Sequence, residues 1–295
     1  MATGISISTT SSLTSGQKTF VANAMMAFEP AAPDPDLVRS ERLPPGHLQW
    51  NLLTYERLAQ GTQLTQGVDL SRVEQLVVAV LTLNPDEHGI LTLLSHKLVR
   101  RQASDNVVAT AGQLVGGGLR RRMANDIIAL YDGFSKSIVG AGSPLDVTYF
   151  RGAVAYLLTD NSATVGPAPM PLVGALHIEQ ISDIVLDISD PGAVISSRFG
   201  WSQELMQNWW RARDRLYAVE IFHSGNIARD TSDDSKGAIF AREALVIAME
   251  TDAEPTEEVD HSLRATEYGL FQSWTEGERA DAHGVEVYSD TIATV

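Results

Sequence analysis

The sequence of 295 residues contains no cysteine, so disulfide bonds and thiolate metal sites are excluded. Its longest apolar run, Leu76 to Leu83 with Thr82 inside it, is far shorter than the roughly 20 residues that a membrane-spanning helix requires. Residues 1–16 have neither a basic start nor an apolar core, so we expect no signal peptide. We therefore expect no association with a membrane, and cysteine usage gives no indication of the redox compartment.

Sequence motifs for catalysis and metal binding are also missing. The seven histidines are scattered and form neither HxxxH nor HExxH. No GxSxG is present, and the glycine-rich segments 116–118 and 140–142 match neither a phosphate-binding loop nor a dinucleotide-binding motif. The acidic loop 230–237 does not fit a calcium-binding EF-hand, because Ser235 and Ala241 stand where that loop requires Gly and Glu. We expect no catalytic residue, no cofactor and no metal ion, and the chain does not read as an enzyme.

Positive charge is scarce and unevenly placed. The formal net charge of −15 at pH 7 argues against a dedicated nucleic-acid binder, because phosphate contacts require clustered Lys and Arg. Residues 97–122 nevertheless hold six positive charges against Asp105, while residues 243–295 hold thirteen acids against two arginines. Two interpretations remain: solvated faces that offset each other, or a basic face that meets an acidic face on a neighbouring copy. For the cluster Arg120, Arg121 and Arg122 we favour an ionic contact between subunits over a contact with DNA.

The longest periodic segment is residues 104–134, in which apolar residues recur at spacings of three and four. Ser104 is a favourable N-cap and Gly133 a stop signal, so the segment predicts one long amphipathic helix, here called the spine helix. Gly116, Gly117 and Gly118 interrupt it, and each costs roughly 1 kcal/mol relative to Ala in a helix. We expect a bend, or a very close neighbouring backbone, at these glycines.

Before the spine helix the pattern predicts extended structure. Residues 1–45 are Ser/Thr-rich and then proline-rich, with a short helix carrying Phe20 and Phe28, and read as an arm. Residues 46–72 predict a projecting hairpin that contains Trp50. Two β-rich runs follow, 73–83 and 89–94, and both are apolar enough to predict buried strands.

After Gly140 helices and strands alternate, which predicts a compact α/β unit within an α+β chain. The expected helices are 147–158, 178–186 and 202–213, and the expected strands are 172–177 and 216–222. The last part predicts a strand that runs into a helix over 239–249, with further strands at 262–274 and 285–288.

This order of elements, with several local segments, resembles the major capsid protein of tailed double-stranded DNA bacteriophages, which has the Hong Kong 97-type fold. No single motif is diagnostic, and the resemblance rests on a collinear series that covers residues 19 to about 290. The segments that carry it are Gln63–Val68, Val73–Val99, Asn125–Phe134, Ala238–Leu245, Arg264–Glu267 and Gly284–Ser289.

The resemblance implies four parts. Residues 1–45 correspond to the N-terminal arm and 46–72 to the E-loop. The P-domain corresponds to 73–137, with the spine helix at 104–134, together with the C-terminal strands of 240–295. The A-domain corresponds to 138–239.

The resemblance also implies that copies assemble as hexamers and pentamers into the icosahedral head of a virion, formed in the host cytoplasm. The head would enclose double-stranded DNA without sequence-specific binding. Further partners would be a separate scaffolding protein, a portal and, optionally, a decoration protein. The candidate subunit-contact residues are Arg120, Arg121, Arg122, Trp50, Phe20 and Phe28.

One feature departs from some relatives, which cross-link their shells through a lysine in the E-loop. The only lysines here are Lys18, Lys97, Lys136 and Lys236, so we expect no such isopeptide bond. Two alternatives stay open. An encapsulin-like nanocompartment would share the fold and hold cargo enzymes, and a soluble α/β enzyme would place its active site within residues 140–240.

Overall fold

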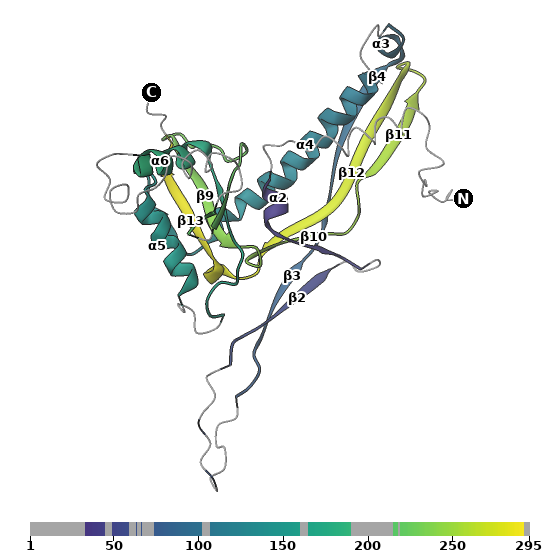
Figure 1. Cartoon of the computed structure of the whole chain (residues 1–295). Coiled ribbons are helices and arrows are strands. Elements are labelled where there is room, and N and C mark those ends of the chain that lie inside the picture. The colour runs from purple at the N-terminus through teal and green to yellow at the C-terminus, as the bar shows by residue number, and fades with distance from the viewer. Residues whose placement is uncertain are drawn as a thin grey trace.

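The computed structural model describes residues 33–44, 49–58, 63, 66, 74–101, 107–159, 165–189, 215–217 and 219–291. Figure 1 shows two bodies that each contain a sheet, and a two-stranded hairpin that projects from the place where they meet. Four of the predicted features lie outside the described residues: Phe20, Phe28, the N-cap Ser104 and the helix 202–213.

The first body is a long sheet with the spine helix along one face. The helix, α4, spans Val107–Ala129 and is followed by a 3-10 turn, η1, at Tyr131–Gly133. The central strand β12 (Ala265–Glu278) pairs with β4 (Asp86–Ser95) on one side, and with β10 (Leu245–Met249) and β11 (Glu254–Asp260) on the other. A short helix, α3 (His96–Arg101), lies at the far tip, where β4 ends (Figure 1).

The periodicity of α4 decides which side it buries. Val108, Val115, Leu119 and Ile127 pack in one cluster with Leu94 of β4 and with Tyr268 and Leu270 of β12. The predicted helix is confirmed over the described residues, and it continues without interruption through Gly116–Gly118. Leu114 differs from the prediction, because its side chain is 72% exposed.

The second body is a six-stranded sheet in the order β5, β13, β9, β6, β8, β7. Its strands are Ser137–Val139, Gly284–Asp290, Asp234–Ala241, Leu172–Leu176, Val219–His223 and Arg215–Leu216, in that same order. Helices α5 (Val147–Leu158) and α6 (Ile178–Ser189) contribute Phe150, Leu157 and Ile184 to its core. The predicted alternation of helices and strands is confirmed here. Strand β13 belongs to this body because it pairs with β5 and β9, although its segment had been grouped with the spine helix.

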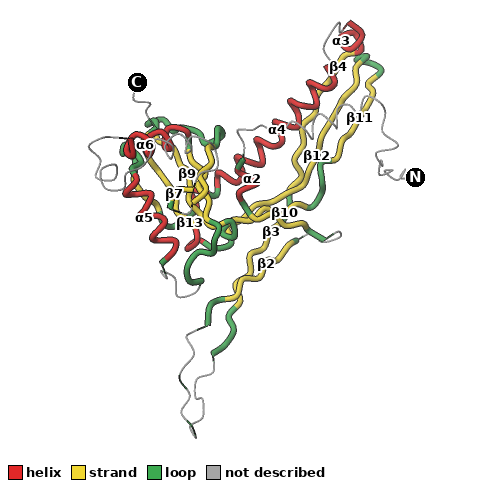
Figure 2. The backbone as a smooth tube through the Cα atoms, in the orientation of Figure 1, coloured by secondary structure: helices red, strands yellow, loops and turns green. Residues whose placement is uncertain are grey.

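The hairpin consists of β2 (Trp50–Tyr55) and β3 (Val78–Leu83), paired antiparallel (Figure 2). Its second strand therefore lies beyond residue 72, inside the run 73–83 that had been predicted as a buried strand. That prediction was wrong, because β3 pairs with β2 rather than with the larger sheet and is exposed along most of its length. Most apolar side chains of β3 therefore lie outside the core.

Two further differences concern the C-terminal third. The segment 239–249 holds the end of β9 and all of β10, joined by a turn, and contains no helix. Both strands are almost wholly buried, and a short, continuous apolar run is as typical of a buried strand as of a helix. Strand β11 was missed because Glu257 and Glu258 resemble a polar loop, whereas charged residues are common on edge strands.

Residues 33–44 are part of the core rather than of a separate arm. The short helix α2 (Asp34–Leu37) leads into β1 (Arg39–Arg42), which pairs in parallel with β10. Leu37, Val38 and Leu43 are buried, and Arg39 donates a 2.5 Å hydrogen bond to Glu243. The described end of the predicted arm therefore stabilises the first body.

Candidate assembly surfaces

The outer face of the hairpin is an apolar ladder. The register pairs Leu53 with Val80 and Tyr55 with Val78, so the four side chains stand on one face of the two strands. Their exposed fractions are 47%, 55%, 55% and 40% for Leu53, Val80, Tyr55 and Val78 respectively. Exposed apolar faces of this kind are typical of surfaces that another molecule covers, because water solvates them poorly. We call these four residues the hairpin ladder.

Trp50 lies on the opposite face of the hairpin, at its root. It packs with Leu52 and Leu81 against a small buried cluster made by Leu83, Val246 and Ala248. Gly277 of β12 permits this contact, since a Cβ there would lie 2.7 Å from Cδ2 of Leu83. Trp50 thus anchors the hairpin to its own chain, and its predicted role between subunits stays a prediction.

Arg120 and Arg122, from the three consecutive arginines, pair with different acids. Arg120 is nearly buried and pairs with Asp36 of α2 across 2.6 Å, while Arg122 pairs with Asp126 one helical turn later across 3.0 Å. Arg121 is exposed on α4. Arg120 and Arg122 are therefore engaged within the chain by these pairs, and an intersubunit contact of this cluster remains a prediction.

A buried carboxylate joins the two bodies. Oδ1 of Asp34 accepts a 2.9 Å hydrogen bond from the Tyr131 hydroxyl, and Oδ2 accepts a 2.6 Å bond from the Ser224 hydroxyl. Burial raises the pKa of Asp34, while both hydroxyls and Arg120 act in the opposite direction. Burial, followed by the charge of Asp34, raises the pKa of Tyr131 well above its ordinary value. Sequence reasoning missed this group because Asp34 lies between two prolines, in a stretch that reads as extended.

A second, more exposed contact ties the end of α4 to the second sheet. Lys236 of β9 donates a hydrogen bond to Asp132 of η1 and lies 3.5 Å from Oε1 of Glu286. The bond to Asp132 raises the pKa of Lys236, and the same bond lowers the pKa of Asp132. Since Lys236 and Asp132 are well exposed, this contact adds little stability compared with Asp34.

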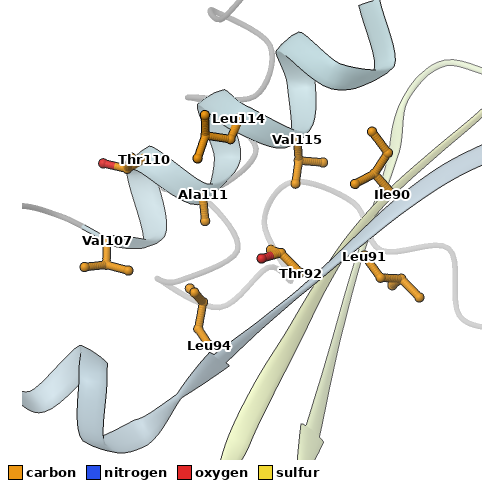
Figure 3. A pocket seen from close by; sticks show the side chains of 9 residues that line it. All are labelled: Ile90, Leu91, Thr92, Leu94, Val107, Thr110, Ala111, Leu114 and Val115. Carbon is orange, nitrogen blue, oxygen red and sulfur yellow. The ribbon is translucent and has the colours of Figure 1, made fainter. Parts of the chain in front are cut away.

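A groove of about 480 Å³ separates α4 from β4 near the tip (Figure 3). The residues that line it are aliphatic except for two threonines: Ile90, Leu91, Thr92, Leu94, Val107, Thr110, Ala111, Leu114 and Val115. No acidic or basic side chain lines the groove. Across the described residues, no three His, Asp or Glu side chains gather closely enough to hold a metal ion. None of the described helices is long and apolar enough to span a membrane.

Known proteins resemble this chain in structure but not detectably in sequence. No protein-family model matches the chain, and no curated protein matches it. The acid-stable capsid of Helicobacter pylori bacteriophage KHP30 aligns with a TM-score of 0.69 at 10% identity, covering 86% of this chain and 88% of that chain. The head of Helicobacter pylori bacteriophage KHP40 gives 0.67 at 9%, with the same coverage. The capsid of Ralstonia phage GP4 gives 0.66 at 10%, covering 88% of each chain.

These alignments include both bodies, since they extend over most of each chain. The protein therefore has the mixed α+β fold of phage head and capsid chains, and the resemblance expected from the sequence is confirmed at the level of the fold.

Proposed function

We propose that this chain is the major capsid protein of a tailed double-stranded DNA phage and that it assembles as pentamers and hexamers into the icosahedral head. The hairpin ladder carries the proposal beyond the shared fold. It places four exposed apolar side chains on an element that projects away from its own core. A solitary soluble protein gains nothing from such a surface, whereas a shell subunit buries it against a neighbour.

The parts of the chain follow the four named domains. The spine-helix body corresponds to the P-domain and the six-stranded body to the A-domain. The hairpin corresponds to the E-loop, and we extend that part to Leu83 because β3 is its second strand. The N-terminal arm then comprises residues 1–32, since residues 33–44 belong to the core.

The acidic composition fits a container for DNA. A subunit with a net charge of −15 does not adhere strongly to the genome, so the DNA can pack and leave without sequence-specific contacts. The partners in this proposal are other copies of the chain, a separate scaffolding protein, a portal and, optionally, a decoration protein. We also propose that no lysine of the E-loop cross-links the shell, because residues 46–83 contain none.

Negative-stain electron microscopy of the chain, expressed alone and together with its scaffolding protein, tests the proposal. We expect closed shells from the wild-type chain, and fewer by at least about tenfold from a variant carrying Leu53→Asn and Val80→Thr, since each lost apolar contact weakens every repeated interface. The matched control carries Leu53→Met and Val80→Ile, which keep the ladder apolar and should assemble normally. A wild-type chain that stays monomeric or dimeric under all assembly conditions contradicts the proposal.

An encapsulin-like compartment is the second candidate, because it is built on the same fold. Particles from the native source distinguish the two: a tail and packaged DNA support the phage head, and a cage filled with protein supports the compartment. The long projecting hairpin favours the phage head.

A further inference from the structure

The tip of the first body carries a second exposed surface, on the face of the sheet that lies opposite α4. In Figure 3 the side chain of Leu91 points away from the helix, whereas those of Ile90, Thr92 and Leu94 point toward it. Leu93 shares the outer face with Leu91 because side chains alternate along a strand. Leu91 and Leu93 are 60% and 49% exposed.

Two glycines make this outer face flat. A Cβ at Gly269 would lie 2.7 Å from Cδ2 of Leu91, and a Cβ at Gly89 would lie 2.3 Å from the ring of Phe271. The side chains of Leu91 and Phe271 therefore lie across glycine positions instead of standing clear of the sheet. The result is a smooth apolar strip, a shape that suits contact with the side of a helix.

Carboxylates surround the strip. The register places Glu254 opposite Phe271 and Glu258 opposite Glu267, so these three acids share the face with Leu91 and Leu93. Glu87 joins them, because it lies four residues before Leu91 on β4. Within the described residues, none of the four acids forms an ion pair. An apolar strip with an acidic rim requires a partner that is apolar and basic.

Helix α3 has that composition, and it is also exposed at the tip (Figure 1). Leu98 and Val99 are 49% and 40% exposed, and the charged Lys97 and Arg100 beside them are exposed too. Within the described residues, neither Lys97 nor Arg100 has an acidic partner. The described part of the chain therefore leaves both the apolar and the basic side chains of α3 exposed.

We propose that α3 of one copy docks on the outer strip of a second copy, with Leu98 and Val99 against Leu91 and Leu93, and with Lys97 and Arg100 facing the acidic rim. The proposal rests on the assembly proposed above and names one of its contacts. Because α3 and the strip are different surfaces, the contact is heterologous, and it forms a closed ring of copies if the rotation between neighbours closes. The charge distribution along the sequence suggests only that a basic face meets an acidic face on a neighbouring copy. This contact assigns particular residues to both faces.

A charge swap tests the contact. The double variant Lys97→Glu/Arg100→Glu and the double variant Glu258→Lys/Glu267→Lys should each lower the yield of shells by about tenfold or more, because each places like charges together. The quadruple variant restores attraction and should recover most of the yield. Charge-preserving controls, Lys97→Arg/Arg100→Lys and Glu258→Asp/Glu267→Asp, should assemble as the wild type does.

The absence of cysteine permits a direct second measurement. A chain carrying both Leu98→Cys and Leu91→Cys should form disulfide-linked multimers when assembled particles are oxidised, and each single variant should stay largely monomeric on a denaturing gel. Equal shell yields from all charge variants, a quadruple variant no better than the doubles, or no cross-links in assembled particles would each overturn the proposal. If the wild-type chain forms no shells at all, the proposed function fails instead.

Discussion

The hydroxyl of Tyr131 donates a hydrogen bond to Asp34 across 2.9 Å and thereby joins the end of the spine helix to α2. The other oxygen of the same carboxylate is bound by Ser224, which follows strand β8 of the second sheet. One fully buried acid therefore connects the N-terminal segment, the spine helix and the second body. The relative placement of the two bodies depends on this group more than on any exposed ion pair between them.

Replacing Asp34 should destabilise the fold strongly. Asp34→Ala leaves two buried hydroxyl groups without their acceptor, and we expect a loss of about 3 kcal/mol in the free energy of unfolding. Asp36→Ala is the matched control, since the carboxylate that it removes is largely exposed, and it should cost less than Asp34→Ala. Chemical denaturation of the unassembled chain measures both. Equal stability of the two variants would show that the buried acid does not hold the bodies together.

Two glycines should respond to alanine in opposite directions. A Cβ at Gly284 would lie 1.9 Å from the ring of Phe134, so Gly284→Ala must displace that ring. We expect the free energy of unfolding to fall by about 2–4 kcal/mol. A Cβ at Gly152, in the middle of α5, meets nothing within 4 Å. Gly152→Ala should therefore stabilise the chain by about 0.5–1 kcal/mol through helix propensity. Thermal denaturation of both variants checks the pair, and a stable Gly284→Ala variant would mean that the contact with Phe134 is loose.

Glu278 should make stability depend on pH near neutrality. Burial, followed by the nearby carboxylate of Asp281, raises the pKa of Glu278 from 4.5 to about 7. An acid with a raised pKa binds its proton more tightly in the folded chain than in the unfolded chain. The contribution of Glu278 to the free energy of unfolding is therefore complete below pH 4.5 and is lost as the pH rises through 7. Because the side chain is partly solvated, we expect a loss of about 1 kcal/mol or less between pH 5 and pH 8.

The variant Glu278→Gln isolates this contribution, since other groups of the chain also titrate. The difference in melting temperature between pH 5 and pH 8 should be smaller for Glu278→Gln than for the wild type. An identical pH profile for the wild type and Glu278→Gln would refute a raised pKa at this position.

The regular periodicities of this sequence were sufficient to predict the spine helix, α5, α6 and β6. They failed where pairing partners decide the structure. Nothing local distinguishes β10 from a buried helix, and only the ladders to β1 and β12 do so. The apolar residues of β3 do not show that one of its faces is exposed. That face is exposed because, among the described residues, β3 pairs only with β2 in a two-stranded sheet.

The candidate surfaces were less predictable than the fold. Arg120 and Arg122 resemble one basic patch in the sequence, yet they pair with Asp36, 84 residues away in the chain, and with Asp126, one helical turn on. The burial of Asp34 could not be predicted from the sequence, because its hydrogen-bond donors, Tyr131 and Ser224, are far away in the chain and only the fold brings them to it. Leu91 and Leu93 likewise become a surface only when β4 is placed beside β12.

The three glycines of the spine helix should matter for assembly more than for the single chain. A Cβ at Gly118 would lie 2.9 Å from Cδ1 of Ile90, the flexible end of a side chain in the groove beneath the helix. Replacing Gly116, Gly117 and Gly118 by Ala should raise helix propensity by about 1 kcal/mol per residue while stiffening the helix and shifting β4. We expect shells of altered diameter or lower yield by electron microscopy. Shells of unchanged size and yield would contradict this expectation.

Truncation at two points separates the arm from the core. Deleting residues 1–32 removes no residue of α2 or β1, so the chain should keep its melting temperature while closed shells are lost. Deleting residues 1–45 also removes the buried Leu37, Val38 and Leu43, the strand paired with β10 and the carboxylate of Asp34. Burying three such side chains contributes about 1.5–3 kcal/mol each, so the longer deletion should unfold or aggregate. Normal shells from the shorter deletion would refute a role of residues 1–32 in assembly, and a fully stable longer deletion would contradict the placement of 33–44 in the core.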